Sequence, residues 1–321
     1  MDGESRRRPI PQLLKGTPDN TPYKVTYIMH QRPPAIPKIT FSNGMAISQL
    51  GFGTLSVQPN REASDANAEI AAGIVTQALK AGYRHIDTAQ SYGTERGVGQ
   101  AIAASGIRRD DLYVASKLGN GHHAPDEVRR SFERTLENLG LEQLDLFLIH
   151  WPLPTLYNGD YVSTWKAVAG LVSDGRLRSA GVSNFLPAHL DRIINETGIV
   201  PVVNQFELHP YFANRATCEA CLQQGIAIEA HSPLGHNREP LSDPIIAGIA
   251  GERGKSTAQI ILRWHIQRAD IAIPKSIRSE RMRENIDIFD FELGSEEMAA
   301  INALDRGDAG RVGPHPGTYE G

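Results

Sequence analysis

Four polar residues of different chemical types lie at or just after the ends of apolar runs that read as β-strands. The runs YRHI, LYVA and LDLFLI precede these residues, which are Asp87, Tyr92, Lys117 and His150. In parallel β/α proteins the chemistry lies at the carboxyl ends of the strands. Tyrosine titrates at about 10, so a lysine cation beside the phenol would lower its pKa. An aspartate would keep the lysine charged, and a histidine could donate a hydrogen bond to a substrate oxygen. The set suits protonation of a carbonyl oxygen while another group delivers hydride.

Strands and helices that would position these residues alternate along the chain. The helical pattern over Pro125–Leu139, for example, repeats apolar residues every fourth position. Eight strands with their crossovers predict an α/β protein, a (β/α)8 TIM barrel in a single domain over residues 39–321, with an extra helix in the seventh crossover. The candidate strands cover residues 50–53, 83–86, 112–115, 144–149, 179–182, 202–205, 227–230 and 271–273.

Two segments come before the barrel. Residues 1–38 are rich in proline and contain Arg6-Arg7-Arg8, which predicts a Pro-rich, basic N-terminal extension. An arm for an anionic partner and an inert tail are both compatible with it. Residues 38–48 predict a β-hairpin with Asn43-Gly44 as the turn.

Composition narrows the class of protein. A net charge of −4 gives no reason to expect nucleic acid or an anionic membrane as partner. No apolar run reaches the length of about 18 residues that a membrane-spanning helix needs. Only two cysteines are present, which favours a reducing, cytoplasmic location. They form a C-x-x-C pair, Cys218 and Cys221, inside a predicted helix, where packing is favoured over a zinc or redox site. We expect no metal.

The longer sequence strings around the four polar residues indicate a protein family more specifically than the four residues do alone. HIDTAQSYGTERGVGQAI, VASKL and DLFLIHWP resemble the aldo-keto reductases, in which Asp, Tyr, Lys and His in this order form the catalytic tetrad. Later strings agree, namely GVSNF, NQFELHPY, SPLG and IPKSIRSERMRENIDIFDFEL. The resemblance runs from about residue 39 to residue 319. It implies that the hairpin closes the bottom of the barrel.

The resemblance also implies NADPH or NADP as cofactor. No G-x-G-x-x-G follows a strand as in a Rossmann site, so the nicotinamide would bind at the barrel mouth. Ser183, Asn184 and Gln205 would hold the nicotinamide amide, although such residues also satisfy strand-end backbone groups. Lys275 and Arg281 at a helix start would grip the 2′-phosphate, unless they are only a solvated basic face. The complete expected cofactor set is Gly53, Thr54, Asp87, Ser183, Asn184, Gln205, His231, Ser232, Leu234, Lys275, Ser276, Ile277, Arg278, Arg281, Glu284 and Asn285.

His231 departs from the resemblance, because most relatives place a Tyr, Trp or Phe there to stack on the nicotinamide. A free imidazole titrates at about 6.5. A protonated ring would repel the oxidised, cationic nicotinamide. NADP⁺ affinity is therefore expected to fall relative to NADPH affinity as the pH drops through that value.

The substrate side has two small residues where relatives often have aromatic rings. The expected lining is Leu55, Tyr92, Gly119, His150 and Trp151, of which Leu55 and Gly119 are the small ones. Fewer aromatic walls mean less apolar contact, which favours a polar sugar-derived ketone or a small dicarbonyl. The short ending GRVGPHPGTY most resembles the microbial 2,5-diketo-D-gluconate reductase branch.

Together these features predict an NADPH-dependent aldo-keto reductase in which Tyr92 protonates a small-molecule carbonyl substrate. We expect a monomer that binds neither nucleic acid nor membrane. One alternative is a cofactor-binding regulatory subunit with little turnover. Another is a serine hydrolase that uses Ser183 with His150, which is disfavoured because GVSNF lacks the second glycine of G-x-S-x-G.

Overall fold

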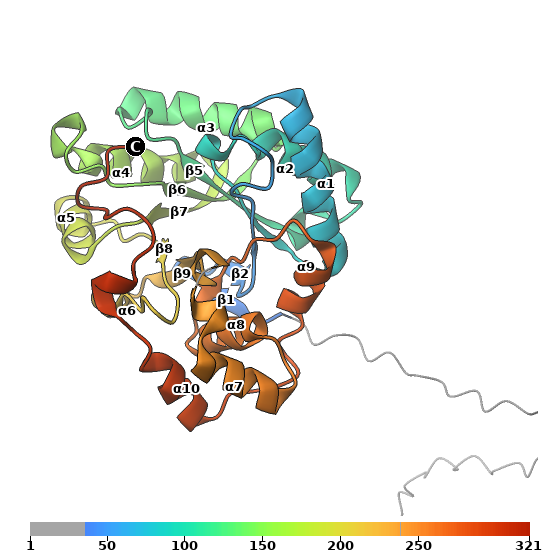
Figure 1. Ribbon diagram of the computed structural model, residues 1–321. Helices are drawn as coiled ribbons and strands as arrows, with labels where there is room; N and C mark the ends of the chain where they lie inside the picture. The colour runs from blue at the N-terminus through green and yellow to red at the C-terminus, as the bar shows by residue number, and fades with distance from the viewer. Residues whose placement is uncertain (1–35, 238) are drawn as a thin grey trace, which may run out of the picture. The chain divides into compact units, whose positions relative to one another are not determined.

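Eight parallel strands form a single sheet that curls into a barrel in the computed structural model (Figure 1). The structure describes residues 36–237 and 239–321, so most of the predicted extension over residues 1–38 lies outside the described residues. Every predicted strand overlaps an observed one, and the predicted (β/α)8 barrel is confirmed. In chain order the strands are β3 (Phe52–Gly53), β4 (His85–Asp87), β5 (Tyr113–Leu118), β6 (Leu144–Ile149), β7 (Leu177–Ser183), β8 (Val203–Glu207), β9 (Ala227–His231) and β10 (Ile271–Ala272).

The barrel closes where the first and last strands of the sheet meet. A parallel bridge joins Leu50, just before β3, to Ala272 in β10. The Gly51 N–H donates to the Ala272 carbonyl and the Ala272 N–H donates to the Gln49 carbonyl, each at 2.9 Å. Closure removes the unpaired strand edges that an open sheet would expose.

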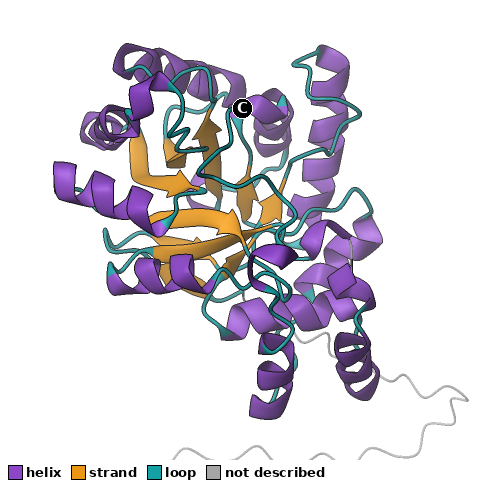
Figure 2. Ribbon diagram, turned by 60° about the vertical axis from the view of Figure 1, so that its left-hand side comes forward, coloured by secondary structure: helices purple, strands orange, loops and turns teal. Residues whose placement is uncertain are grey.

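The helices of the described residues lie around the outside of the strands (Figure 2). Two of them, α7 and α8, separate β9 from β10, which confirms the predicted extra helix. None of these helices combines the length and the apolar character that crossing a membrane requires. The helices are α1 (Asp65–Ala81), α2 (Glu95–Ala104), α3 (Pro125–Leu139), α4 (Tyr161–Gly170), α5 (Pro187–Thr197), α6 (Arg215–Gln223), α7 (Pro244–Arg253), α8 (Thr257–Gln267), α9 (Ser279–Ile286) and α10 (Ser295–Asn302).

Helix α3 shows how local sequence produces this layer. Proline stands in its first turn, where its missing N–H costs nothing, and Gly140 ends it in the left-handed conformation with φ of 62°. Its buried face includes Val128 and Phe132. The Phe132 ring packs on Phe147 of β6 with centroids 5.2 Å apart. Each such buried side chain contributes about 1.5–3 kcal/mol.

The predicted hairpin closes the amino-terminal end of the barrel. It is formed by β1 (Lys38–Thr40) and β2 (Ala46–Ser48), paired antiparallel. Phe41 and Ile47 are buried and belong to one apolar cluster with residues at the starts of three barrel strands, namely Tyr113, Val203 and Ile271. The chemistry is thereby restricted to the opposite, carboxyl end of the strands.

The C-x-x-C pair lies within α6, away from its N-terminus. Cys218 and Cys221 are both buried, and burial raises the pKa of each thiol to about 12. The packing role predicted for them is confirmed. Among the described residues no group of three or more His, Cys, Asp or Glu side chains could hold a metal ion.

Candidate active site

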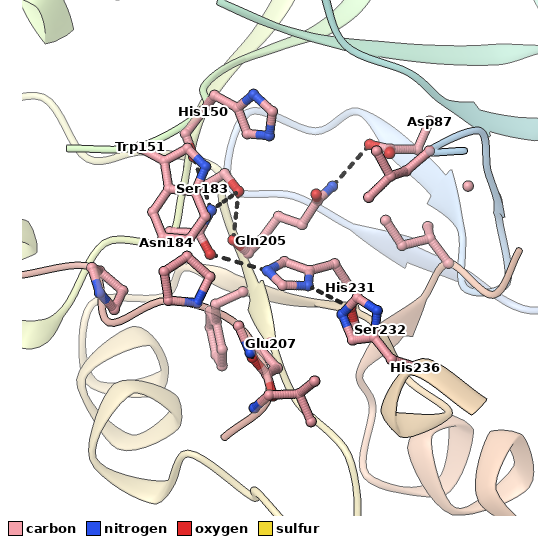
Figure 3. A pocket seen from close by; sticks show the side chains of 18 of the residues that line it. Asp87, His150, Trp151, Ser183, Asn184, Gln205, Glu207, His231, Ser232 and His236 are labelled. Atoms are coloured by element: carbon pink, nitrogen blue, oxygen red, sulfur yellow. Dashed lines mark hydrogen bonds between the residues drawn. The ribbon is translucent and has the colours of Figure 1, made fainter. Parts of the chain in front are cut away.

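A cavity of about 830 Å³ opens at the carboxyl ends of the strands (Figure 3). It brings together residues from most of the barrel strands and the loops that follow them. The predicted residues that line it are Gly53, Leu55, Asp87, Tyr92, His150, Trp151, Ser183, Asn184, Gln205, His231, Ser232, Leu234 and Lys275.

Beneath the cavity, Asp87 and Lys117 form an ion pair. Asp87 faces Ala115 across β4 and β5, and Lys117 comes two residues later on the same side of β5. The Lys117 Nζ donates to both Asp87 carboxylate oxygens, at 2.6 and 2.7 Å, and to the Thr88 carbonyl at 3.0 Å. Burial is the largest single effect on Lys117 and lowers its pKa, but the charge and hydrogen bonds of Asp87, together with other nearby acidic groups, outweigh burial and raise the pKa above its ordinary value. The lysine is therefore held as a cation.

Tyr92 lies over this pair, at the end of a short 3-10 helix (Gln90–Tyr92) that comes after β4. The Lys117 Nζ is 5.0 Å from the centre of its ring. Burial raises the Tyr92 pKa more than the Lys117 charge lowers it, so the net shift is upward. The predicted lowering below the ordinary value is therefore wrong, because the phenol loses more by leaving water than it gains from the cation. Tyr92 keeps its proton at neutral pH.

His150 faces Tyr92 across the cavity floor, with ring centroids 5.6 Å apart in an edge-to-face arrangement. Burial, reinforced by the charge of Lys117, holds the His150 pKa well below its ordinary value. The ring is neutral at pH 7 and carries one N–H donor. Its Nδ1 lies 3.4 Å from the Ser91 Oγ.

The three predicted nicotinamide-binding residues hold one another in place. The Ser183 hydroxyl donates to the Gln205 carbonyl at 2.9 Å, and the Asn184 Nδ2 donates to the Ser183 Oγ at 3.1 Å and to the His150 carbonyl at 2.9 Å. Among the described residues no hydrogen bond joins Ser183 to His150, so nothing activates Ser183 as a nucleophile. The hydrolase alternative loses its support.

His231 is joined to this group by hydrogen bonds. Its Nε2 lies 3.0 Å from the Asn184 Oδ1 and its Nδ1 lies 3.1 Å from the Ser232 Oγ. Because the Asn184 oxygen can only accept, the Nε2 carries the ring proton and the Nδ1 accepts from Ser232. Burial lowers the His231 pKa to about 4. The expected titration at about 6.5 is thus displaced to a more acidic range.

A second buried carboxyl, Glu229 of β9, was not predicted. The Gln205 Nε2 donates to the Glu229 Oε2 and to the Asp87 Oδ1, each at 2.9 Å. On its other side, the Glu229 Oε1 lies 3.4 Å from the His85 Nε2. Burial, with the nearby Asp87 charge, raises the Glu229 pKa to about 8, and burial lowers that of His85 to about 4. The contact therefore joins two neutral groups. With its nitrogen engaged by two carboxyls, Gln205 has only its amide oxygen left to accept a hydrogen bond.

A smaller cavity of about 540 Å³ lies beside the first, at the N-terminus of α9. Leu234 and Lys275 line both cavities, so the two adjoin. The predicted cofactor residues that line the smaller cavity are Leu234, Lys275, Ser276, Ile277, Arg278, Arg281, Glu284 and Asn285.

Besides Lys117, which lies beneath the cavity floor, two predicted site residues line neither cavity. Thr54 is buried, and its Oγ1 donates to the Asp87 carbonyl at 2.9 Å. Gly119 is also buried, and its N–H donates to the Gln90 Oε1 at 2.7 Å. Asn120, the next residue, lines the larger cavity instead. Both predicted residues support the floor and wall of the site from behind.

The carboxyl-terminal segment forms part of the larger cavity, which sequence reasoning missed. The Glu207 carboxylate accepts from the Val312 and Gly313 N–H groups, each at 2.7 Å. Burial alone would raise the Glu207 pKa, but these bonds and one from His209 outweigh it and lower the pKa to about 2. Further along the segment, the ring of Tyr319 packs on Trp151 with centroids 4.2 Å apart. The tail thus adds an aromatic ring to this side of the cavity, next to Trp151.

Known proteins of one family are similar to this chain in sequence and in fold. The chain matches the Aldo/keto reductase family over residues 49–306. It is 46% identical over 283 residues to an aldo-keto reductase of Mycolicibacterium smegmatis, covering 88% of this chain and 98% of that protein. It is 41% identical to the glyoxal reductase of Bacillus subtilis, covering 87% and 95%. A crystal structure of a Gox0644 mutant in complex with NADPH superposes with a TM-score of 0.81 at 40% identity, covering 89% of this chain and 99% of that one.

The protonation state of Glu229 has a measurable consequence. Folded Glu229 keeps its proton up to about pH 8, whereas an unfolded glutamate loses it above about 4.3. As the pH rises from 5 to 8, ionisation stabilises only the unfolded chain, so the free energy of unfolding falls. Glutamine cannot ionise, so this decrease should be absent in Glu229→Gln. Between pH 5 and pH 8 the free energy of unfolding of the variant should therefore rise by roughly 1–4 kcal/mol relative to that of wild type. Urea unfolding at both pH values measures the difference.

Glu229→Leu is the matched control. Leucine fills similar space but leaves the Gln205 Nε2 with one partner fewer, so this variant should be destabilised at both pH values. A Gln variant that loses stability relative to wild type from pH 5 to pH 8 would show that Glu229 is ionised in the folded protein.

Proposed function

The chain belongs to the aldo/keto reductase family, and from that premise we propose that it reduces small aldehydes and ketones to alcohols with NADPH. The observation that carries the proposal is the buried Asp87–Lys117 pair directly beneath Tyr92, with neutral His150 opposite. The proposal needs a proton donor above a fixed cation, and Tyr92 above Lys117 at the cavity floor fits that need.

The two adjoining cavities fit a nicotinamide dinucleotide. At one end Gln205 offers its amide oxygen as an acceptor, beside Ser183 and Asn184. At the other end Lys275 and Arg281 line the smaller cavity, and within the described part of the chain neither cation has an ion pair. Unpaired cations at a helix N-terminus favour a phosphate ligand over a solvated basic face. When bound, NADPH supplies the hydride.

The protein's own part in the reaction is the proton. Tyr92 holds its proton at neutral pH and donates it to the carbonyl oxygen as negative charge develops there. Lys117 then stabilises the phenolate that remains, and Asp87 keeps Lys117 charged and in place. His150, neutral and facing Tyr92, orients the carbonyl through its ring N–H.

For the substrate, we propose a polar sugar-derived ketone, such as diketogluconate, or a small dicarbonyl. Support comes from the non-aromatic Leu55 in the cavity wall and from the similarity to a glyoxal reductase. Membership of the 2,5-diketo-D-gluconate reductase branch stays a prediction. A regulatory subunit with little turnover fits less well, because it would have no need for a buried ion pair beneath the tyrosine.

Tyr92→Phe tests the proton donor. The variant should lose about 10²–10⁴-fold in kcat, the usual contribution of general acid catalysis. NADPH binding should be nearly unchanged, because the hydroxyl is not among the groups that fit the cofactor. Steady-state kinetics with a simple aldehyde and fluorescence titration of NADPH measure the two effects. Retention of more than about a tenth of kcat would assign the proton to another group, first of all His150.

Arg281→Ala tests the cofactor preference. Loss of a charged hydrogen bond worth about 1.5–3 kcal/mol should weaken NADPH about tenfold or more and leave NADH almost unchanged. The control is Arg283→Ala, which removes an exposed cation of the same helix that does not line the cavity. Equal losses for NADPH and NADH, or equal losses in the two variants, would remove Arg281 from the phosphate site.

The low pKa of His231 predicts that the relative affinity for NADP⁺ and NADPH does not depend on pH near neutrality. With a pKa of about 4, His231 is neutral throughout pH 6 to 8.5 and does not repel NADP⁺. The ratio of the NADP⁺ and NADPH dissociation constants should be flat over that range in wild type and in His231→Tyr. Because the 2′-phosphate titrates in both forms, it cancels in the ratio. A ratio that rises in wild type alone as the pH drops below 7 would show that His231 becomes charged.

A further inference from the structure

The charged groups that line the larger cavity are nearly all engaged within the protein. Asp87 is bound by Lys117, and Glu207 accepts from two backbone N–H groups and from His209. The Arg311 guanidinium lies 2.9 Å from the Asp308 carboxylate and over the ring of Phe212. Two cations are left, Lys275 and Arg61, for which the described residues provide no ion pair.

These two cations belong to different parts of the site. Lys275 also lines the smaller cavity, where the cofactor phosphate is proposed to bind. Arg61 lines only the larger cavity, in the loop between β3 and α1. Its positive charge acts on both Tyr92 and His150, the two groups proposed to face the substrate oxygen. Arg61 is therefore a cation of the substrate side.

The loop that carries Arg61 is held in place by polar side chains. The buried Gln58 amide donates to the Tyr92 carbonyl at 2.6 Å. The Asn67 amide donates to the Asn60 Oδ1 at 2.6 Å and to the Glu62 carbonyl at 2.9 Å, on either side of Arg61. These bonds fix the backbone from which the guanidinium extends.

Gly93, the residue after Tyr92, confirms how closely this loop packs. It has a φ of +71°, and a Cβ at this position would lie 2.5 Å from the Arg61 carbonyl oxygen. Only glycine allows this approach. The Arg61 backbone is thus packed directly against the residue next to the proposed proton donor.

We propose that Arg61 binds a carboxylate of the substrate, so that the preferred substrates are carbonyl compounds that also carry an acid group. A guanidinium pairs with a carboxylate through two parallel hydrogen bonds, and a fixed backbone lowers the entropy lost on binding. The inference rests on the proposed reductase function and narrows its substrate class to keto acids and aldehyde acids.

A matched pair of substrates tests the proposal, namely succinic semialdehyde and 4-oxobutanamide, which differ in charge but hardly in size. Wild type should prefer the acid by about tenfold or more in kcat/KM, mainly through KM. Arg61→Gln should abolish this preference, mainly by raising KM for the acid. Arg61→Lys should retain part of it. The control Arg96→Gln removes a cation that pairs with Asp65 at the start of α1, outside the cavity, and should keep the full preference.

Salt gives a second measurement that needs no variant. Raising the ionic strength should increase the wild-type KM for the acid and leave that for the amide unchanged. If wild type reduces both compounds equally well, or if Arg61→Gln keeps the preference, the role of Arg61 is overturned while the reductase function stands. If wild type with NADPH reduces neither these two compounds nor any other aldehyde, the proposed function itself fails, and the Arg61 proposal with it.

Discussion

The site depends on one buried ion pair, Lys117 with Asp87. Each charge loses several kcal/mol of solvation inside a barrel, so neither is tolerable without the other. The register of β4 and β5 brings the two charges together, because Lys117 lies two residues beyond Ala115, the partner of Asp87, on the same side of β5. Both side chains are buried, and Asp87 lines the cavity, where Tyr92 lies over the pair.

Around this pair the barrel keeps four neighbouring titratable groups neutral. Glu229 shares Gln205 with Asp87, and a second carboxylate there would compete for a single lysine. Burial resolves the conflict by keeping Glu229 protonated and His85 uncharged. The same effect keeps His150 and His231 neutral at the cavity. The Lys117 charge under Tyr92 therefore lies in a weakly polar surrounding that strengthens it, while the Arg61 charge acts on Tyr92 from the cavity wall.

Structural features that depend on local sequence patterns could be predicted from the sequence. The strands, the hairpin and the residues at strand ends were predictable because apolar runs and turn residues carry that information. The direction of the Tyr92 pKa shift could not be predicted. The sequence indicates a lysine near the tyrosine, but it does not show how deeply the phenol is buried, and burial has the larger effect. Glu229 offered a usable signal, a lone carboxylate inside a buried strand. Arg61 offered none, since the bond between Gln58 and the Tyr92 carbonyl spans 34 positions and fixes a loop that no local rule describes.

The two ends of the site obey different physical rules. At the cofactor end, cations gather at the start of α9, where backbone N–H groups already favour an anion and the sequence motif is local. At the substrate end, loops from opposite ends of the chain meet, namely the one that bears Arg61 and the tail held by Glu207. Substitutions in either loop change the cavity wall without touching the ion pair beneath it. Substrate choice can therefore vary while the proton chemistry stays constant, which explains why the reaction type was readable from strand ends and the substrate was not.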